Sequence, residues 1–231
     1  MNQLSSSLLF MTTTAPSPRV RVRRAPTRGV YDRAQIDAIL DEALVCHVGF
    51  VHDGQPFVIP TLHARVGDVV YVHGSSASRM LRMLAEGAPC ALTATLLDGI
   101  VLARSAFHHS ANYRSVTVLG RASLVQSDEE RLRALEAFSE HLVPGRWAQV
   151  RAPNRKELKA TQVLALALDE ASAKVRRGPP VDDDEDVGSD VWAGEIPLQL
   201  HALQPRPDPQ LAAGIALPRE VSAWRATGEQ V

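Results

Sequence analysis

The stretch that decides the fold is residues 44–61, LVCHVGFVHDGQPFVIPT. Two runs rich in apolar and β-branched residues flank the dipeptide Asp53-Gly54. Asp-Gly between apolar runs is a strong hairpin signal, because a type I′ turn requires positive φ at both central residues. We therefore predict two antiparallel strands, over residues 45–51 and 56–66.

The same pattern continues along the chain. Gly67-Asp68 separates the second run from a third, residues 69–73, and Asp98-Gly99 predicts a further turn between strands at about 90–97 and 100–103. Residues 113–122 and 163–169 are predicted to be strands as well. Parallel strands need long crossovers that are usually helical, so these short connections indicate antiparallel pairing.

Helices are predicted at three places. Capping-box patterns at Asp32 and Ser127 each precede apolar residues at helical spacing, and a shorter helix over residues 79–86 ends at Gly87. Six or so antiparallel strands with one inserted and one flanking helix predict a mainly β fold with flanking helices (α+β). We expect a closed or partly closed β-barrel.

The composition fits one globular domain, with 231 residues of which 45% are hydrophobic. The net charge of −1 gives no global field to gather nucleic acid or an anionic membrane. No apolar run approaches the ~20 residues of a membrane-spanning helix. Cys46 and Cys90 form no CxxC pair and are predicted to be buried thiols. We expect a cytoplasmic protein with no nucleic-acid or membrane partner.

The two ends of the chain differ from its middle. The first thirty-one residues contain no acidic residue and carry five arginines after a Ser- and Thr-rich start, which is the composition of a disordered or targeting-like segment. Prolines at 205, 207, 209 and 218 indicate an extended tail. We therefore divide the chain into an N-terminal segment (1–27), one folded domain (28–204) and a Pro-rich C-terminal tail (205–231).

The most suggestive candidate site is residues 71–79, YVHGSSASR, where a strand ends in small hydroxyl residues before a helix. Free backbone N–H groups at a helix N-terminus attract a phosphate, Ser hydroxyls donate to it, and Arg79 adds a charge-assisted bond. The plainer alternative is a helix capped by Ser78. Motifs such as GxSxG, HExxH and GxGxxG do not occur, so a borrowed cofactor is more plausible than an assembled catalytic triad.

Two further segments carry polar or aromatic groups. His108 and His109 precede Asn112-Tyr113-Arg114-Ser115, but no third metal ligand follows at a suitable spacing, so we predict no metal site. Arg114 and Ser115 leave a strand on opposite faces. Trp192 is costly to leave in water, and it acts either as a structural lid or as a ligand contact.

Five ordered motifs together resemble a known family: LVCHVGFVHDGQPFVIPT, VVYVHGSSASRMLRML, NYRSVTVLGRA, KELKATQVLALALDEASAKVRRGPP and VWAGEIPL. The chain from about Arg23 to Leu198 resembles the FMN-binding split-barrel proteins related to pyridoxamine 5′-phosphate oxidase, especially the nitroimidazole-reductase-like branch. The resemblance implies a six-stranded antiparallel split β-barrel, FMN as cofactor, and a homodimer with FMN at the subunit interface.

The resemblance also implies which residues meet the cofactor. The isoalloxazine would be lined by backbone groups of Val58, Ile59, Pro60 and Thr61. The ribityl phosphate would be held by the segment with His73, Gly74, Ser75, Ser78 and Arg79. The strand start Asn112, Tyr113, Arg114 and Ser115 would close over the cofactor, and Trp192 would come from the partner subunit. Oxidases of the wider family carry Lys where Met80 stands, so Arg82 or Arg114 would replace the missing cation.

A flavin-dependent oxidoreductase is the function that the resemblance implies. A donor such as NAD(P)H would reduce the flavin, which would pass electrons to a small aromatic or heteroaromatic substrate or to oxygen. No catalytic residue is identified, and His73 is either near the reacting region or merely structural. The alternative is a non-catalytic binding protein for FMN, haem or deazaflavin, with His108 and His109 as candidate haem ligands. The residues dedicated to pyridoxal phosphate are not evident, so vitamin B6 oxidation does not transfer.

Overall fold

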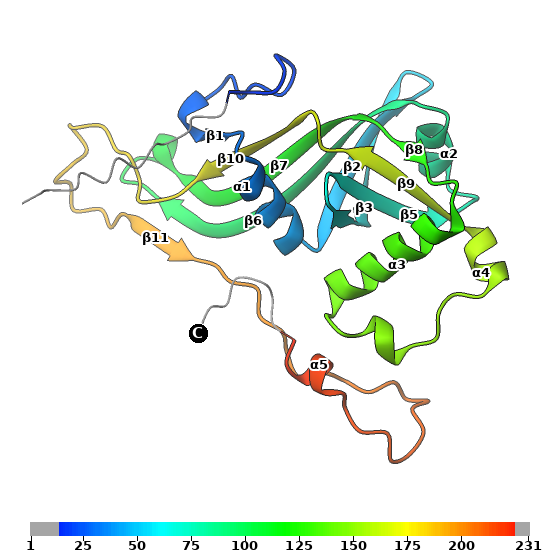
Figure 1. The fold of residues 1–231 in the computed structure, drawn as a ribbon. Coiled ribbons are helices and arrows are strands. Elements are labelled where there is room, and N and C mark those ends of the chain that lie inside the picture. Colours follow the sequence, from blue (N-terminus) through cyan, green and yellow to red (C-terminus); the bar gives the residue numbers. More distant parts are fainter. Residues whose placement is uncertain (1–13, 225–231) are drawn as a thin grey trace, which may run out of the picture.

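The computed structural model describes residues 14–224 as two antiparallel sheets with helices packed against them (Figure 1). The strands are β1 (Gly29–Val30), β2 (Val45–His52), β3 (Gln55–Leu62), β4 (Ala64–Val66), β5 (Val69–Ser75), β6 (Pro89–Leu102), β7 (Ser110–Arg121), β8 (Ser123–Leu124), β9 (Thr161–Ala167), β10 (Ala171–Arg176) and β11 (Gly194–Pro197). The α-helices are α1 (Arg33–Glu42), α2 (Arg79–Ala85), α3 (Asp128–Leu142), α4 (Arg155–Ala160) and α5 (Arg219–Ser222). Short 3₁₀ turns lie at Pro26–Arg28, Ala106–His108 and Trp147–Gln149.

The larger sheet, sheet A, has the strand order β1-β10-β7-β6-β2-β3, with β11 also paired to β6. The smaller one, sheet B, has the order β4-β5-β9-β8, and every strand pair in both sheets is antiparallel. The prediction of a mainly antiparallel β fold with flanking helices is confirmed. The sheets do not close into one continuous barrel, which is consistent with a split barrel.

The hairpin predicted from residues 44–61 is present. Asp53 and Gly54 both have positive φ, 50° and 76°, and the register pairs Phe50 with Phe57 and His47 with Pro60. Gly67 likewise has φ of 57° in the turn between β4 and β5. These two turns demand conformations that Gly, Asn and Asp adopt most readily, and this is why they could be found from the sequence.

The predicted turn at Asp98-Gly99 is wrong. The strand β6 runs through these residues without reversing, with only a register shift between Leu97 and Gly99. Glycine is needed there for another reason, because a Cβ added to Gly99 would lie 3.0 Å from the backbone oxygen of Ile196 in β11. A glycine inside a strand often marks such a close approach of a second backbone.

The helix starts follow their capping residues. Asp32 accepts from the N–H of Gln35 at 3.0 Å to open α1, and Ser127 accepts from Glu130 at 3.3 Å to open α3, as predicted. A third cap, Asn154 with Glu157, opens α4 and was missed by the sequence interpretation.

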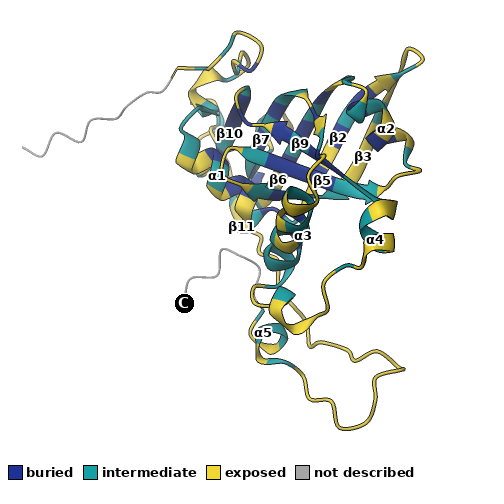
Figure 2. Ribbon diagram, turned by 45° about the vertical axis from the view of Figure 1, so that its right-hand side comes forward, coloured by how far each residue is buried: buried dark blue, intermediate teal, exposed yellow. Residues whose placement is uncertain are grey.

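Two apolar cores hold the layers together (Figure 2). The first lies between the inner face of sheet A, helices α1 and α2, and one face of sheet B. The second lies between the other face of sheet B and α3, and its buried members are Ala64, Tyr71, Val125, Ala134, Phe138 and Val163. Among residues 14–224, no helix layer packs on the outer face of sheet A, opposite the first core.

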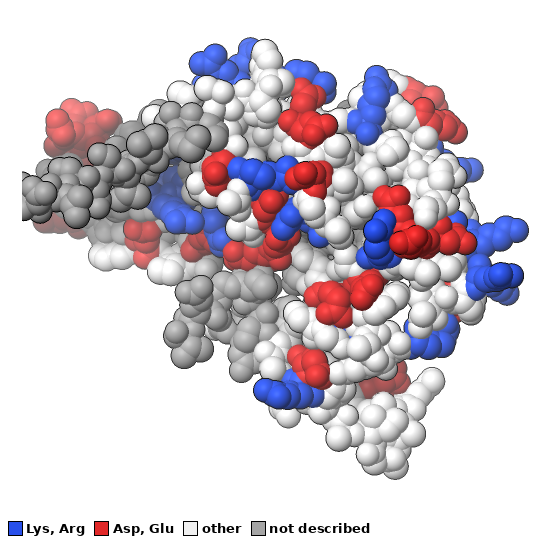
Figure 3. Space-filling model, in the orientation of Figure 1, with Lys and Arg blue, Asp and Glu red and all other residues white. Residues whose placement is uncertain are grey.

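The C-terminal segment beyond β11 runs away from the sheets before it reaches α5 (Figure 1). It exposes several large apolar side chains: Leu200, Leu203, Leu211, Ile215 and Leu217. In Figure 3 the outermost tip of this segment is white, and charged side chains lie where Figure 1 places α5. Within residues 14–224, none of the helices has the length and apolar character needed to cross a membrane. Of the predicted N-terminal segment, residues 1–13 lie outside the described residues.

The close approach at Gly99 gives a prediction. We expect Gly99→Ala to loosen β11, because the added methyl group meets the Ile196 oxygen. The readout is hydrogen exchange at the amide of Leu198, which donates to the Asp98 oxygen at 2.9 Å. Gly49→Ala is the matched control in the same sheet, since its Cβ would have no such neighbour nearer than 3.7 Å. Equal exchange in the two variants would contradict the assignment.

Candidate functional site

The strand β3 forms one edge of sheet A and pairs only with β2 among the described residues. Its side chains are unusually open for an apolar strand: Val58 is 64% exposed and Ile59 is 36% exposed. An exposed apolar edge strand with free backbone groups invites pairing with another molecule. The residues that the resemblance placed at the flavin ring, Val58 to Thr61, therefore lie on an accessible edge.

The loop between β5 and α2 uses most of its own donors. Ser78 caps α2 by accepting from Leu81 at 3.5 Å, and Ser75 Oγ accepts from the Ala77 N–H at 3.2 Å. The backbone N–H of Ser76 donates to the Ala160 oxygen at 3.0 Å. The loop amides thus offer little to an anion, and the first-turn amides of α2 and the side chain of Arg79 are left to contact it.

Arg79 connects this loop to β3. Its guanidinium carbon lies 4.2 Å from the centroid of the Phe57 ring, a cation–π contact on an exposed side chain. Within residues 14–224, Arg79 makes no ion pair, so its charge is available to a ligand. Residues 57–61 and 75–79 therefore form one site, which we call the β3–α2 site.

His73 is adjacent in sequence but lies on the other side of sheet B. Its ring packs against Phe138 of α3, with 4.2 Å between the centroids, and its buried Nδ1 has no hydrogen-bond partner. Burial lowers the pKa of His73, so the imidazole is neutral near pH 7. Gly74, one residue on, faces Leu81 of α2 instead. His73 thus presents an uncommitted neutral imidazole beneath α3.

Asn112 has a structural position. The buried Arg176 donates to its side-chain oxygen and, at 2.9 Å, to the backbone oxygen of Gly178. The Asn112 amide nitrogen donates in turn to the carboxylate of Glu195 in β11. This Asn112 cluster (Asn112, Arg176 and Glu195) joins β7, β10 and β11 and satisfies a buried charge, a role that residue type alone does not reveal.

Arg114 is also committed. Its guanidinium donates hydrogen bonds to the carboxylates of Glu42 and Asp98. These bonds, mainly the ones to Glu42, raise the pKa of Arg114 above its usual value. Two carboxylates already balance this charge. Of the two cations considered as replacements at Met80, Arg82 is the accessible one, because its side chain is exposed and makes no ion pair in the described part of the chain.

The two predicted cofactor segments are far apart within one chain. Phe57 pairs with Phe50, which is level with Cys90 of β6 and Gly120 of β7. Arg114 lies six positions along β7 from Gly120, which is roughly 20 Å at the rise of an extended strand. The fold therefore does not bring the β3–α2 site and residues 112–115 together.

The remaining predicted cofactor residues also lie far from the β3–α2 site. They are Trp192, Tyr113 and Ser115. Trp192 is 65% exposed and precedes β11, and its ring lies against Gly194. Tyr113 is half-buried, and Ser115 donates to the Lys174 backbone oxygen at 3.3 Å. Among the hydrogen bonds and ion pairs of the described residues, none joins Trp192 to the β3–α2 site.

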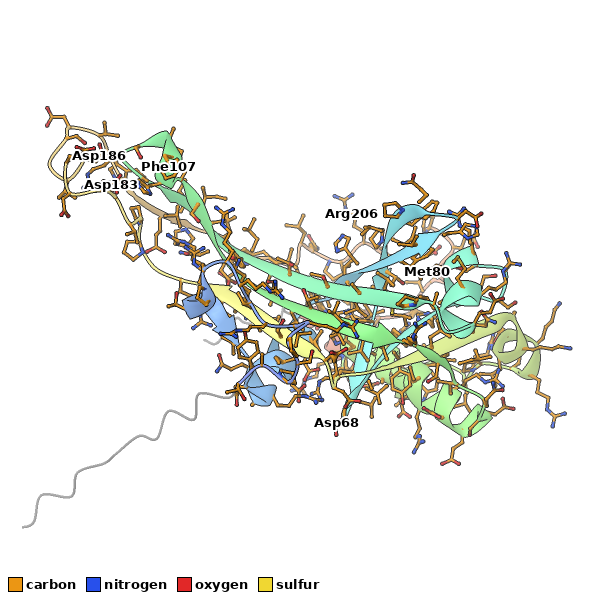
Figure 4. All side chains as sticks on the ribbon, turned by 90° about the horizontal axis from the view of Figure 1, so that it is seen from above. Asp68, Met80, Phe107, Asp183, Asp186 and Arg206 are labelled. Atoms are coloured by element: carbon orange, nitrogen blue, oxygen red, sulfur yellow. The ribbon has the colours of Figure 1, made fainter. Side chains whose placement is uncertain are left out.

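The paired histidines lie at the far tip of the β6–β7 hairpin. His108 contacts Asp183 at 3.1 Å, and His109 Nδ1 accepts from the Ala103 N–H at 3.0 Å. Figure 4 shows Phe107 and Asp183 at one end of the molecule and Met80 of α2 at the other. Within the described residues, no group of three or more His, Cys, Asp or Glu side chains is arranged to hold a metal ion.

Comparison with known proteins identifies the family. A family model described as pyridoxamine 5′-phosphate oxidase matches residues 32–175, which is more than half of the chain. This protein therefore belongs to the pyridoxamine 5′-phosphate oxidase family. Among curated proteins, none matches the chain.

Solved structures refine the comparison. The flavocytochrome Anf3 from Azotobacter vinelandii is 43% identical with a TM-score of 0.88, and the match covers 92% of this chain and 99% of that one. An FAD- and haem-binding protein from Mycobacterium smegmatis is 42% identical with a TM-score of 0.82, covering 86% and 97%. A 5-nitroimidazole antibiotic resistance protein from Bacteroides thetaiotaomicron shares the fold at 22% identity and a TM-score of 0.54, covering 64% and 86%.

The free charge of Arg79 gives a prediction. Arg79→Ala should weaken flavin binding by about 1.5–3 kcal/mol if the guanidinium makes a charge-assisted bond to a flavin phosphate. Fluorescence-quenching titration of the apoprotein with FMN and with FAD measures this. Arg133→Ala, which removes an exposed arginine from α3, is the control and should leave the affinity unchanged. An unaltered affinity in Arg79→Ala would place the phosphate elsewhere.

Proposed function

We propose that this protein is a flavin-dependent oxidoreductase that also binds haem. The observation that carries the proposal is the 43% identity to a flavocytochrome over nearly the full length of both chains. A second relative, 42% identical, is described as binding FAD and haem. Two relatives with the same pair of redox groups favour a haem-containing flavoprotein over a protein that binds flavin alone.

The β3–α2 site fits a flavin. Residues 57–61 offer an open backbone edge beside apolar side chains, and Arg79 offers an unpaired cation within 4.2 Å of the Phe57 ring. A planar ring with a phosphate arm needs both features. The resemblance in sequence implied FMN, whereas the FAD-binding relative favours FAD. In either case this chain's residues orient the ring and hold its phosphate.

His73 is the residue that best fits a haem. Five histidines of the described chain are at least half-buried: His52, His63, His73, His108 and His141. All except His73 contact a protein partner through a ring nitrogen. A neutral imidazole whose nitrogen has no hydrogen-bond partner is free to serve as an axial iron ligand, as a histidine does in many haem proteins. When bound, flavin supplies hydride and single-electron transfer and haem supplies single-electron exchange.

A homodimer would complete the flavin site. Arg114 lies roughly 20 Å along the strands from the level of Phe57, the ring that Arg79 contacts. Trp192 lies farther still, because it precedes β11, whose Gly194 pairs with Leu102 near the other end of β6. These residues therefore reach the same flavin only if a second copy supplies them. The exposed apolar groups of β3 and of the C-terminal segment provide surface for that second copy. We propose that each flavin lies between two copies.

The substrate and donor are proposed by class. An NAD(P)H-type donor and a small aromatic or heteroaromatic acceptor suit an open apolar edge beside a redox cofactor. Cys46 and Cys90 are free and buried, and burial raises the pKa of Cys46 to about 12, so neither thiol is poised for chemistry. Such inert thiols suit a reducing cytoplasm.

The cofactors can be read directly from the purified protein. We expect flavin absorption together with a Soret band, and release followed by mass spectrometry should yield FAD. Release of FMN would support the cofactor that the sequence resemblance implies. Release of a deazaflavin would exclude both FMN and FAD as the bound cofactor. Bleaching of the flavin by NAD(P)H would support catalysis, whereas a stable spectrum would favour a storage or sensing protein. Absence of any flavin would overturn the proposal.

The haem assignment has its own test. His73→Ala should lose the Soret band and retain the flavin, because the β3–α2 site does not use the imidazole. His109→Ala is the matched control at the hairpin tip and should keep both chromophores. If His109→Ala lost the haem and His73→Ala kept it, the axial ligand would belong to the β6–β7 tip.

A further inference from the structure

A cavity lies on the outer face of sheet A, away from the β3–α2 site. Residues 19–24, which we call the basic arm, cross over β7 and β10 and enclose a volume of about 320 Å³. Its lining carries five cations: Arg19, Arg21, Arg23, Arg24 and Lys174. Cavities of this size hold part of a small-molecule ligand.

The floor of the cavity consists of paired polar side chains. In the β7–β10 register Ser115 lies opposite Lys174, and Thr117 lies opposite Ser172. Alternate residues of a strand share a face, so these four side chains stand together on the outer side of the sheet. Three hydroxyl groups and one ammonium group thus lie together on a sheet face that no helix covers within the described residues.

The basic arm is held in place through its first four residues, 19–22. Val20 is only 5% exposed, and the N–H of Val22 donates to Tyr31 Oη at 2.8 Å. Arg19 contacts Glu170 at 2.8 Å, and Ser17 donates to the same carboxylate at 2.5 Å. These contacts hold the arm over the sheet, so its arginines are presented in one place.

The charge of the cavity is not balanced. Its lining contains five cationic side chains and no carboxylate. Arg19 is the only one of the five with an ion pair in the described part of the chain. The whole chain has a net charge of −1, so this concentration of positive charge is local. Clustered cations favour a multiply charged anion. Of the three hydroxyl groups, Ser115 already donates to the Lys174 backbone oxygen and Thr117 lies 3.3 Å from Thr93 Oγ1, so the cations supply most of the attraction.

We propose that this cavity binds the diphosphate group of a nucleotide. The inference rests on the proposed redox function, in which two such nucleotides occur: the adenylate half of FAD and a nicotinamide dinucleotide donor. The strands β10 and β3 are four steps apart in sheet A, roughly 19 Å at the spacing of neighbouring strands. The cavity is therefore remote from the flavin ring of the same chain, but its residue Ser115 belongs to the segment 112–115 that would meet the flavin of the second copy, so either nucleotide can reach it.

The test is a charge reversal in the basic arm, Arg21→Glu with Arg23→Glu. The probes are ADP and NADPH, titrated into the full-length protein by calorimetry, with the flavin-to-protein ratio measured on the same samples. We expect at least a tenfold loss of ADP affinity, with stronger binding at low salt in the unaltered protein. The control is Arg133→Glu with Arg206→Glu, two exposed arginines outside the cavity, which makes the same change in net charge.

The outcomes separate the two sources. Loss of ADP and NADPH affinity with an unchanged flavin ratio assigns the cavity to the donor. Loss of ADP affinity together with loss of FAD assigns it to the adenylate of the flavin. Equal affinities in the arm variant and the control would overturn the proposal. Failure of the proposed function would appear separately, as an unaltered protein that contains no flavin. Lys174→Met, a single change in the cavity floor, should reproduce the loss of ADP affinity.

Discussion

The pairing of β6 with its neighbours is the constraint on which the rest of the structure depends. This strand of fourteen residues pairs with β7 over most of its length, with β2 through residues 90–94, and with β11 through residues 99–102. Since β2 and β11 occupy successive parts of the strand, the sheet extends well beyond the first hairpin. That extension places the β3–α2 site and the Asn112 cluster far apart along the sheet.

Local signals were enough to predict much of this fold. The turn at Asp53-Gly54 and the caps at Asp32 and Ser127 are determined by backbone conformation and by neighbouring residues, so they are legible in sequence. The turn predicted at Asp98-Gly99 was wrong because glycine there accommodates β11, which lies about a hundred residues later in the chain. No local pattern could distinguish that close approach from a turn.

The candidate site was predictable to a similar extent. Arg79 was singled out beside a Ser-capped helix, and the fold places it against Phe57 with its charge unpaired. Asn112 and Arg114 have residue types suited to a ligand, but contacts with Arg176, Glu195, Glu42 and Asp98 already occupy them. Such partners are tertiary, and the sequence offers no sign of them. His73 shows the opposite case, because only the fold reveals that its imidazole is uncommitted.

The central claim is that each flavin site is built from two copies of the chain, with Arg79 from one and Trp192 from the other. The most direct measurement is flavin binding by a purified heterodimer of an Arg79→Ala copy and a Trp192→Ala copy, each with a different affinity tag. If the sites are shared, the heterodimer keeps one intact site, and it binds half as much flavin as the unaltered protein at its normal affinity. If each chain builds its own site, both sites are defective, and the heterodimer binds as weakly as the two altered homodimers.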